Sequence, residues 1–274
     1  MSGRTGPRGL ELMRDELSGR DLAIVRQVAD LRLVSGSQLE SVHFSPAEHA
    51  TSGAAARAAR RVLERLTRDD LLVRLERRIG GIRAGSASFI YALGPVGHRL
   101  LAETDIARPR LREPSLPFVD HTLAIAQLVV DLTLAARRGL HEVLRLQTEP
   151  WCWRRYSAMM GGEAVLRPDL FVSIGQGDLE HRWFIEVDRG TEHLPTLLRK
   201  CRAYDSYYRS GVEQAEHDVF PRVAWLVTSA RRRRQLRAAI DKDRQLTAAM
   251  FEVVENHDVL GAMVDDDLAE GAAS

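Results

Sequence analysis

Residues 166–188 read LRPDLFVSIGQGDLEHRWFIEVD, and this stretch decides how the second half of the chain folds. Two runs rich in apolar and β-branched residues flank a glycine-containing loop over 175–180. Such a pattern is typical of a β-hairpin. If the loop has these bounds, Ile174 pairs with His181, and the register of both strands is fixed.

Counting along the two strands brings three carboxylates together. Asp169 lies opposite Glu186, and directly opposed residues have Cβ atoms about 5 Å apart. Asp188 shares a face with Glu186 because side chains alternate along a strand. Like charges this close are destabilising, so either a divalent cation or a basic side chain is expected between them. The opposite, buried face takes Trp183, Ile185 and Val187.

The segments around the hairpin predict an α/β domain with a mixed central sheet. A long apolar helix comes first, then a three-strand meander, a helix and a strand, with a further helix and strand after them. The predicted helices are 119–138, 194–209 and 231–241, and the predicted strands are 143–148 (extending at most to 153), 166–174, 181–188, 223–228 and 250–255.

The first third of the chain predicts a winged helix-turn-helix, which makes the whole protein α+β. Three helices are expected over 19–33, 37–43 and 51–68, followed by strands 71–75 and 89–93 around a glycine-rich loop, and a helix over 95–101. In that fold the third helix enters the major groove of DNA. The expected DNA-binding residues are Arg57, Arg60, Arg61 and Arg65 on this helix and Arg77, Arg78 and Arg83 on the wing. The alternative is a solvated arginine face on a winged helix that binds no DNA.

Charge is distributed unevenly although the net charge is only +1. Residues 51–83 hold nine arginines against four acids, whereas residues 252–274 hold seven acids and neither Lys nor Arg. Lys200 and Lys242 are the chain's two lysines. No uninterrupted apolar run approaches the roughly 20 residues that span a bilayer, so a cytoplasmic protein without a membrane partner is expected.

Composition divides the chain into five segments. We expect a flexible lead-in over 1–17, the winged helix over 18–107, a proline-rich linker over 108–117, the α/β domain over 118–260 and a disordered acidic tail over 261–274. Two cysteines are too few for a disulfide framework and lie in no zinc-binding pattern.

The order Pro168-Asp169, hairpin, Glu186-x-Asp188 resembles the PD-(D/E)XK nuclease core. The winged helix together with LRPDLFVSIG, FIEVDRGTE and LLRKCRAYDSYY resembles the replication-relaxation family of plasmid and integrative-element proteins, over about residues 22–254. This resemblance implies a protein that binds double-stranded DNA and acts in replication or mobilisation of a plasmid or mobile genetic element. A relaxase or other replication proteins are further partners in this context, and a homodimer is a separate alternative.

The nuclease resemblance also implies roles for individual residues. Asp169 and Glu186 would hold Mg²⁺ or Mn²⁺, and Asp188 would add a ligand or orient water. The pattern has lysine where this chain has Asp188, so Lys200 on the following helix would take over the role of assisting phosphodiester cleavage. His121, Glu149 and Tyr204 are auxiliary candidates.

The alternative is a nuclease fold that does not cleave. In it the acids pair with Arg167, Arg189 or Lys200, and the protein is a DNA-binding regulator or an accessory factor for replication or the relaxosome.

Overall fold

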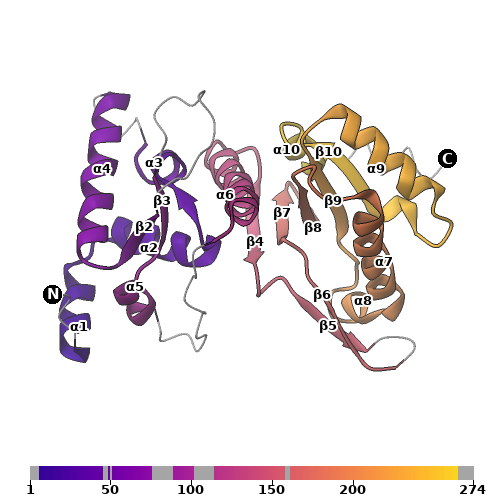
Figure 1. Ribbon diagram of the computed structural model, residues 1–274, viewed down its shortest axis with the longest axis horizontal. Coiled ribbons are helices and arrows are strands. Elements are labelled where there is room, and N and C mark those ends of the chain that lie inside the picture. The colour runs from indigo at the N-terminus through magenta and orange to yellow at the C-terminus, as the bar shows by residue number, and fades with distance from the viewer. Residues whose placement is uncertain are drawn as a thin grey trace. The chain divides into compact units, whose positions relative to one another are not determined.

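A computed structural model describes residues 6–45, 49, 51–75, 89–101, 114–157 and 161–264 (Figure 1). The chain divides into two compact units, Met1–Asp131 and Leu132–Ser274. This boundary lies inside helix α6 (Leu116–Arg137), and not in the predicted linker over 108–117. Residues 108–113 of that linker lie outside the described residues.

The first unit holds most of the predicted helices and strands of the N-terminal third. Its elements are α1 (Pro7–Glu16), α2 (Gly19–Leu31), β1 (Val34–Ser35), α3 (Gly36–His43), α4 (Ser52–Arg68), β2 (Leu72–Leu75), β3 (Ile90–Leu93) and α5 (Pro95–Leu100). The strands form an antiparallel sheet in the order β1-β3-β2. The short strand β1 was not predicted, because two residues carry no periodicity.

Side-chain caps fix where the three central helices begin. Ser18 and Asp21 form a reciprocal capping box at α2, and Ser35 and Gln38 form another at α3. The Thr51 side chain accepts a hydrogen bond from the backbone of Ala54 at the start of α4. Helix α3 therefore begins at Gly36, one residue before the predicted start at 37.

Helix α1 replaces most of the flexible lead-in expected over 1–17. Arg14 donates a hydrogen bond to the carbonyl of Leu100 in α5 over 2.9 Å. Leu10 and Met13 are half-buried on one side of the helix. This contact is made with a segment 86 residues later, which no local pattern in the sequence reveals.

The second unit is built around a five-stranded mixed sheet, as predicted, and the whole chain is α+β. The sheet has the order β10-β9-β8-β7-β4, in which β8, β9 and β10 are parallel while β4, β7 and β8 are antiparallel. Its elements are β4 (Glu142–Thr148), β5 (Arg154–Ser157), β6 (Glu163–Leu166), β7 (Leu170–Gln176), β8 (Leu179–Asp188), α7 (Leu194–Ser210), α8 (Val212–His217), β9 (Arg222–Val227), α9 (Ala230–Lys242), the 3-10 turn η2 (Ala248–Met250), β10 (Phe251–Glu255) and α10 (Val259–Val264).

The hairpin has the predicted register, with Ile174 paired to His181, but a tighter turn. Two residues, Gly177 and Asp178, connect the strands in place of the longer loop expected over 175–180, and Gly177 takes φ 58°. The strand predicted over 166–174 is interrupted at Pro168 and splits into β6 and β7. β6 pairs with β5 in a separate hairpin that was not predicted.

Both faces of the sheet are buried. Trp183 lies on one face, where its indole nitrogen donates to the carbonyl of Met263 in α10. On the other face Phe184 and Trp225 pack with Tyr204 of α7 and Leu236 of α9. The face that carries Glu186 and Asp188 is therefore covered by helices.

Helix α6 is, among the described helices, the one long and apolar enough by length and composition to cross a membrane; 39% of its most apolar window is buried within the structure. In the sequence no uninterrupted apolar run marks this helix, because Asp120 and Asp131 lie among its apolar residues.

Candidate functional site: a buried cluster of carboxylates

Glu186 stands at the centre of the predicted site and has both carboxylate oxygens occupied. Its side chain is buried on β8. Lys200 Nζ donates to Oε2 over 3.1 Å, and the Tyr204 hydroxyl donates to Oε1 over 2.7 Å. Lys200 and Tyr204 are one turn apart on α7, so the same helix face supplies both donors.

Asp169 lies one position beyond the last paired residues of β7 and β8, Leu170 and Ile185. The register therefore places it opposite Glu186, as predicted. Its backbone nitrogen donates to the carbonyl of Ile185 over 3.1 Å, and its Oδ2 accepts from the backbone of Val187 over 2.7 Å. These two bonds fix the carboxylate at the edge of the hairpin.

Asp188 is held by a residue that was not predicted for this role. Arg232, in the first turn of α9, forms an ion pair with Asp188 through Nε and donates from Nη2 over 3.3 Å. Gly190 adds a backbone hydrogen bond of 2.9 Å. The candidate partners have other surroundings: Arg167 lies over the Trp153 ring, and Arg189 is exposed and forms no ion pair among the described residues.

The electrostatics follow from burial. Burial and the neighbouring Asp169 raise the pKa of Glu186 to about 8, although Lys200 and Tyr204 act to lower it. Burial lowers the pKa of Lys200, but Glu186 and Asp169 outweigh it and hold the pKa above its ordinary value. Burial and the adjacent Glu186 raise the pKa of Tyr204 well above its ordinary value. Lys200 is therefore a cation that two carboxyl groups, those of Glu186 and Asp169, stabilise.

The residues present do not fit a resident divalent cation in this arrangement. Carboxylate oxygens are the ligands Mg²⁺ prefers, but a donor occupies each oxygen of Glu186, and Arg232 holds Asp188. No group of three or more His, Cys, Asp or Glu side chains that could hold a metal ion occurs in the described part of the chain. Basic side chains, which are one of the two expected ways to offset the acids, lie beside Glu186 and Asp188.

The auxiliary candidates divide between the units. Tyr204 is in the cluster. Glu149 follows β4 and is half-buried. Burial of the Cys152 thiol raises its pKa, and the negative charge of Glu149 raises it further. His121 lies on α6 in the first unit, so its predicted approach to the acids stays a prediction.

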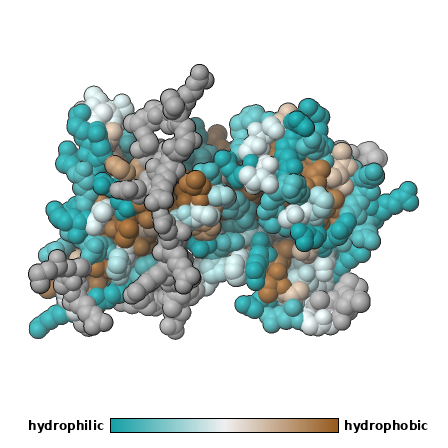
Figure 2. All heavy atoms as spheres, in the orientation of Figure 1, coloured by the Kyte–Doolittle hydropathy of each residue, from teal (hydrophilic) through white to brown (hydrophobic). Residues whose placement is uncertain are grey.

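The predicted DNA-binding arginines of α4 differ in exposure. Arg57, Arg60 and Arg61 are exposed opposite the buried stripe of the helix, and hydrophilic side chains cover this outer face (Figure 2). Arg65 is half-buried and lies 2.6 Å from the buried Asp21, so the structure gives it a role in holding α4 to α2. Arg77, Arg78 and Arg83 lie outside the described residues.

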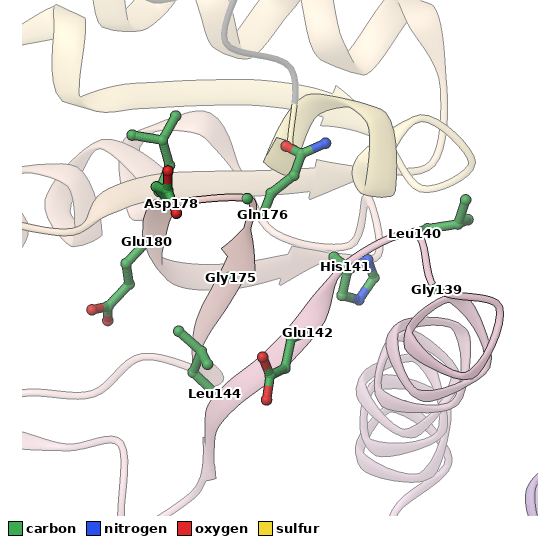
Figure 3. A pocket seen from close by; sticks show the side chains of 11 residues that line it. Gly139, Leu140, His141, Glu142, Leu144, Gly175, Gln176, Asp178 and Glu180 are labelled. Carbon is green, nitrogen blue, oxygen red and sulfur yellow. The ribbon is translucent and has the colours of Figure 1, made fainter.

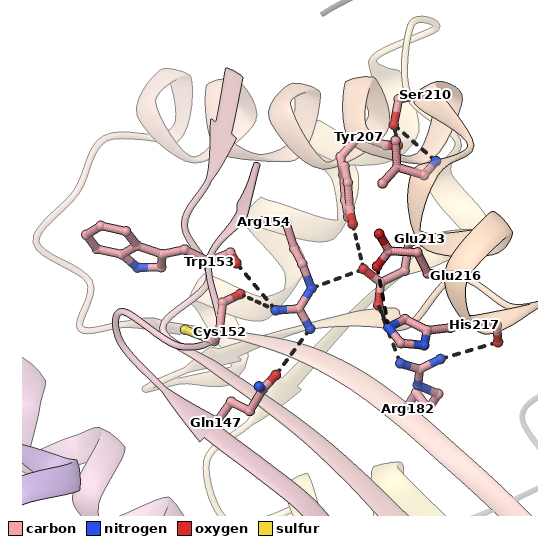
Figure 4. Close-up of polar contacts among 11 residues, drawn as sticks. Gln147, Cys152, Trp153, Arg154, Arg182, Tyr207, Ser210, Glu213, Glu216 and His217 are labelled. Carbon is pink, nitrogen blue, oxygen red and sulfur yellow. Dashed lines mark hydrogen bonds and ion pairs between the residues drawn. The ribbon is translucent and has the colours of Figure 1, made fainter. Parts of the chain in front are cut away.

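A second buried polar cluster was not predicted from the sequence (Figure 4). Glu213 of α8 has no exposed surface and accepts from Arg154 over 3.0 Å and from the Tyr207 hydroxyl over 2.6 Å. Arg182 also faces it at 3.5 Å, and Arg154 reaches back to Gln147. These contacts tie α8 to the strands and explain why a charged residue is fully buried.

Comparison with known protein families identifies a match over most of the chain. The model of a family described as replication-relaxation matches residues 25–223. No curated protein and no solved structure gives a significant match.

Proposed function

The chain belongs to the replication-relaxation family, and from that premise we propose that it binds double-stranded DNA and acts in replication or mobilisation of a plasmid or mobile element without cutting the DNA. The proposal has two parts, one for each unit. The first unit supplies DNA binding, and the second supplies a nuclease-like fold whose acids are neutralised by the chain's own basic side chains.

For the first unit we propose a winged helix with α4 as its recognition helix. The order α2, α3, α4, β2, β3 supports this assignment. The observation that carries it is the exposed face of Arg57, Arg60 and Arg61, none of which forms an ion pair within the described residues. Arginines without acidic partners are available to phosphates and base edges.

For the second unit we propose a PD-(D/E)XK-like fold in which the acid cluster is structural. Helix, three-strand meander, helix and strand follow in the order that this resemblance implies. Lys200 and Arg232 neutralise Glu186 and Asp188 from α7 and α9. The cluster then serves to hold both helices on the sheet.

Metal-dependent DNA cleavage is the second candidate function. The proximity of Asp169, Glu186 and Lys200 favours cleavage. The nuclease pattern has lysine where this chain has Asp188, and Lys200 on the next helix would supply that side chain. It requires Lys200 to release a carboxylate on which a divalent cation could then bind, and the observed hydrogen bonds oppose this.

The test of the proposed function is the salt dependence of affinity for plasmid-derived duplex DNA. The slope of log K against log salt is about −0.9 for each DNA phosphate that the protein neutralises. Arg57→Ala with Arg61→Ala should therefore make the slope shallower by about 2. The matched control, Arg155→Ala with Arg244→Ala, removes the same charge from exposed positions in the second unit and should leave the slope unchanged. Equal slopes for both double variants would contradict the assignment of α4.

A further inference from the structure

The second unit has a pocket at the end of the sheet where β7 turns into β8 (Figure 3). It is formed by residues 139–142, by Leu144 of β4 and by the hairpin tip over 175–180. Its volume is about 560 Å³, which lies within the range of binding pockets. The seven residues of β7 separate the hairpin tip from Asp169, roughly 23 Å of strand, so this pocket is distinct from the carboxylate cluster.

Apolar side chains surround the pocket. Leu140, Leu144 and Leu179 are 57%, 50% and 53% exposed. A bulge between Val143 and Arg145 disrupts the pairing of β4 at Leu144. Single exposed leucines are ordinary, but three around one concavity indicate a surface that a partner covers.

Negative charge lies beside these leucines. Glu142 and Asp178 are exposed, and neither forms an ion pair among the described residues. Glu180 is partly compensated, since Ser173 donates to it and Arg182 lies 3.7 Å away. No residue that lines the pocket is Lys or Arg. The site therefore repels phosphate and attracts a cationic group.

His141 adds an unused hydrogen-bond acceptor. Its side chain is 9% exposed and lines the pocket, and its Nε2 is buried without a hydrogen-bond partner in the described part of the chain. Burial lowers the pKa of His141, while a backbone hydrogen bond with Leu132 acts in the other direction. A hydrogen bond that raises the pKa of His141 is one that the ring donates to the Leu132 carbonyl. Because Nε2 has no partner, the donor is Nδ1, and Nε2 of the neutral ring keeps a lone pair. A buried acceptor of this kind is costly unless a donor reaches it.

We propose that this pocket binds a segment of a partner protein in which leucine-like side chains alternate with lysine or arginine. The leucines bury the apolar rim, the basic groups pair with Glu142 and Asp178, and one N–H group donates to His141. The occupant is thus a basic, apolar peptide and not DNA. The proposal is independent of DNA binding by the first unit.

Fluorescence anisotropy with the full chain tests this site. The probe is a labelled seven-residue peptide of alternating Lys and Leu, compared with peptides in which Glu replaces Lys or Ser replaces Leu. We expect the first peptide to bind at least tenfold more tightly than either of the others. Absence of saturable binding, or equal affinity for all three peptides, would overturn the proposal.

Variants locate the binding on the molecule. Glu142→Lys with Asp178→Lys should weaken binding at least tenfold, and Leu144→Ser with Leu179→Ser should do the same. Glu216→Lys with Asp258→Lys reverses the same charge at exposed positions elsewhere in the unit and should change affinity less than twofold. All of these positions are exposed, so the variants should fold, and an unchanged urea unfolding transition provides the check. Equal weakening by the control pair would place the peptide outside the pocket.

Discussion

Lys200 Nζ lies 3.1 Å from Glu186 Oε2, and this ion pair joins α7 to β8 within the carboxylate cluster. The two side chains differ in burial, since that of Lys200 is 39% exposed and that of Glu186 is 2% exposed. The chain has 39 basic residues, of which only Lys200 and Lys242 are lysines. The Lys200 ammonium group thus occupies a position beside the acids. In a metal site, the metal ion would bind there.

Above about pH 8, where Glu186 is ionised, replacing Lys200 by Met should destabilise the fold, because it leaves the Glu186 carboxylate buried without its cation. Breaking a buried ion pair costs about 3–5 kcal/mol, and we expect about 1–2 kcal/mol because solvent screens the half-exposed ammonium. Lys242→Met, at an exposed position, is the control and should cost less than about 0.5 kcal/mol. Urea denaturation measures both values. Equal effects of the two substitutions would remove the stabilising role of Lys200.

Stability should depend on pH through Glu186. Its pKa is raised to about 8 in the folded protein by burial and Asp169. The unfolded chain loses this proton near the ordinary pKa of glutamate, so folding takes up a proton between the two values. The free energy of unfolding should therefore fall as pH rises from about 4.5 to about 8. Glu186→Gln should flatten this part of the curve, and an unchanged curve would argue against a raised pKa.

Arg65→Ala should act on stability more than on DNA binding. The ion pair of Arg65 with Asp21 lowers the pKa of Asp21 against the effect of burial, and removing it should cost about 1–2 kcal/mol. Arg61→Ala, one turn earlier on the exposed face, should cost less than about 0.5 kcal/mol. Thermal unfolding compares the two variants. If Arg61→Ala proves the more destabilising, the assigned faces of α4 are wrong.

Glu213→Gln should be among the most damaging substitutions in the second unit. It removes the charge that compensates Arg154 and Arg182 in a fully buried site, which should cost about 3 kcal/mol. Tyr207→Phe removes one hydrogen bond to the same carboxylate and should cost about 1 kcal/mol. Glu216→Gln, on the exposed side of α8, is the control. Chemical denaturation of the three variants should give this order.

The parts of the site that could be predicted are those that depend on local rules. Side-chain alternation and the hairpin register place Asp169 opposite Glu186, and helical spacing places Lys200 and Tyr204 on one face. The caps at Ser18 and Thr51 are likewise visible in the sequence.

The parts that could not be predicted depend on how distant elements pack. Arg232 reaches Asp188 across 44 residues, so the pairing depends on where α9 lies on the sheet. Four consecutive arginines give no sign of which one turns inward. The residues around Glu213 form a short polar segment, in which an acid is expected to lie on the surface. Only the packing of α8 shows that Glu213 is buried. The pocket at the hairpin tip depends on a bulge in β4 that leaves no pattern in the sequence.

Incubation with plasmid and a divalent metal shows whether the carboxylate cluster cuts DNA. Supercoiled plasmid is incubated with the protein and either Mg²⁺ or Mn²⁺, and both plasmid retardation and the open-circular product are measured on gels. We predict retardation that is reduced by Arg57→Ala with Arg61→Ala, and no open-circular product with either metal. A metal-dependent open-circular product that disappears in Asp169→Ala and Glu186→Ala, while retardation remains, would contradict the account and establish the cluster as a nuclease site.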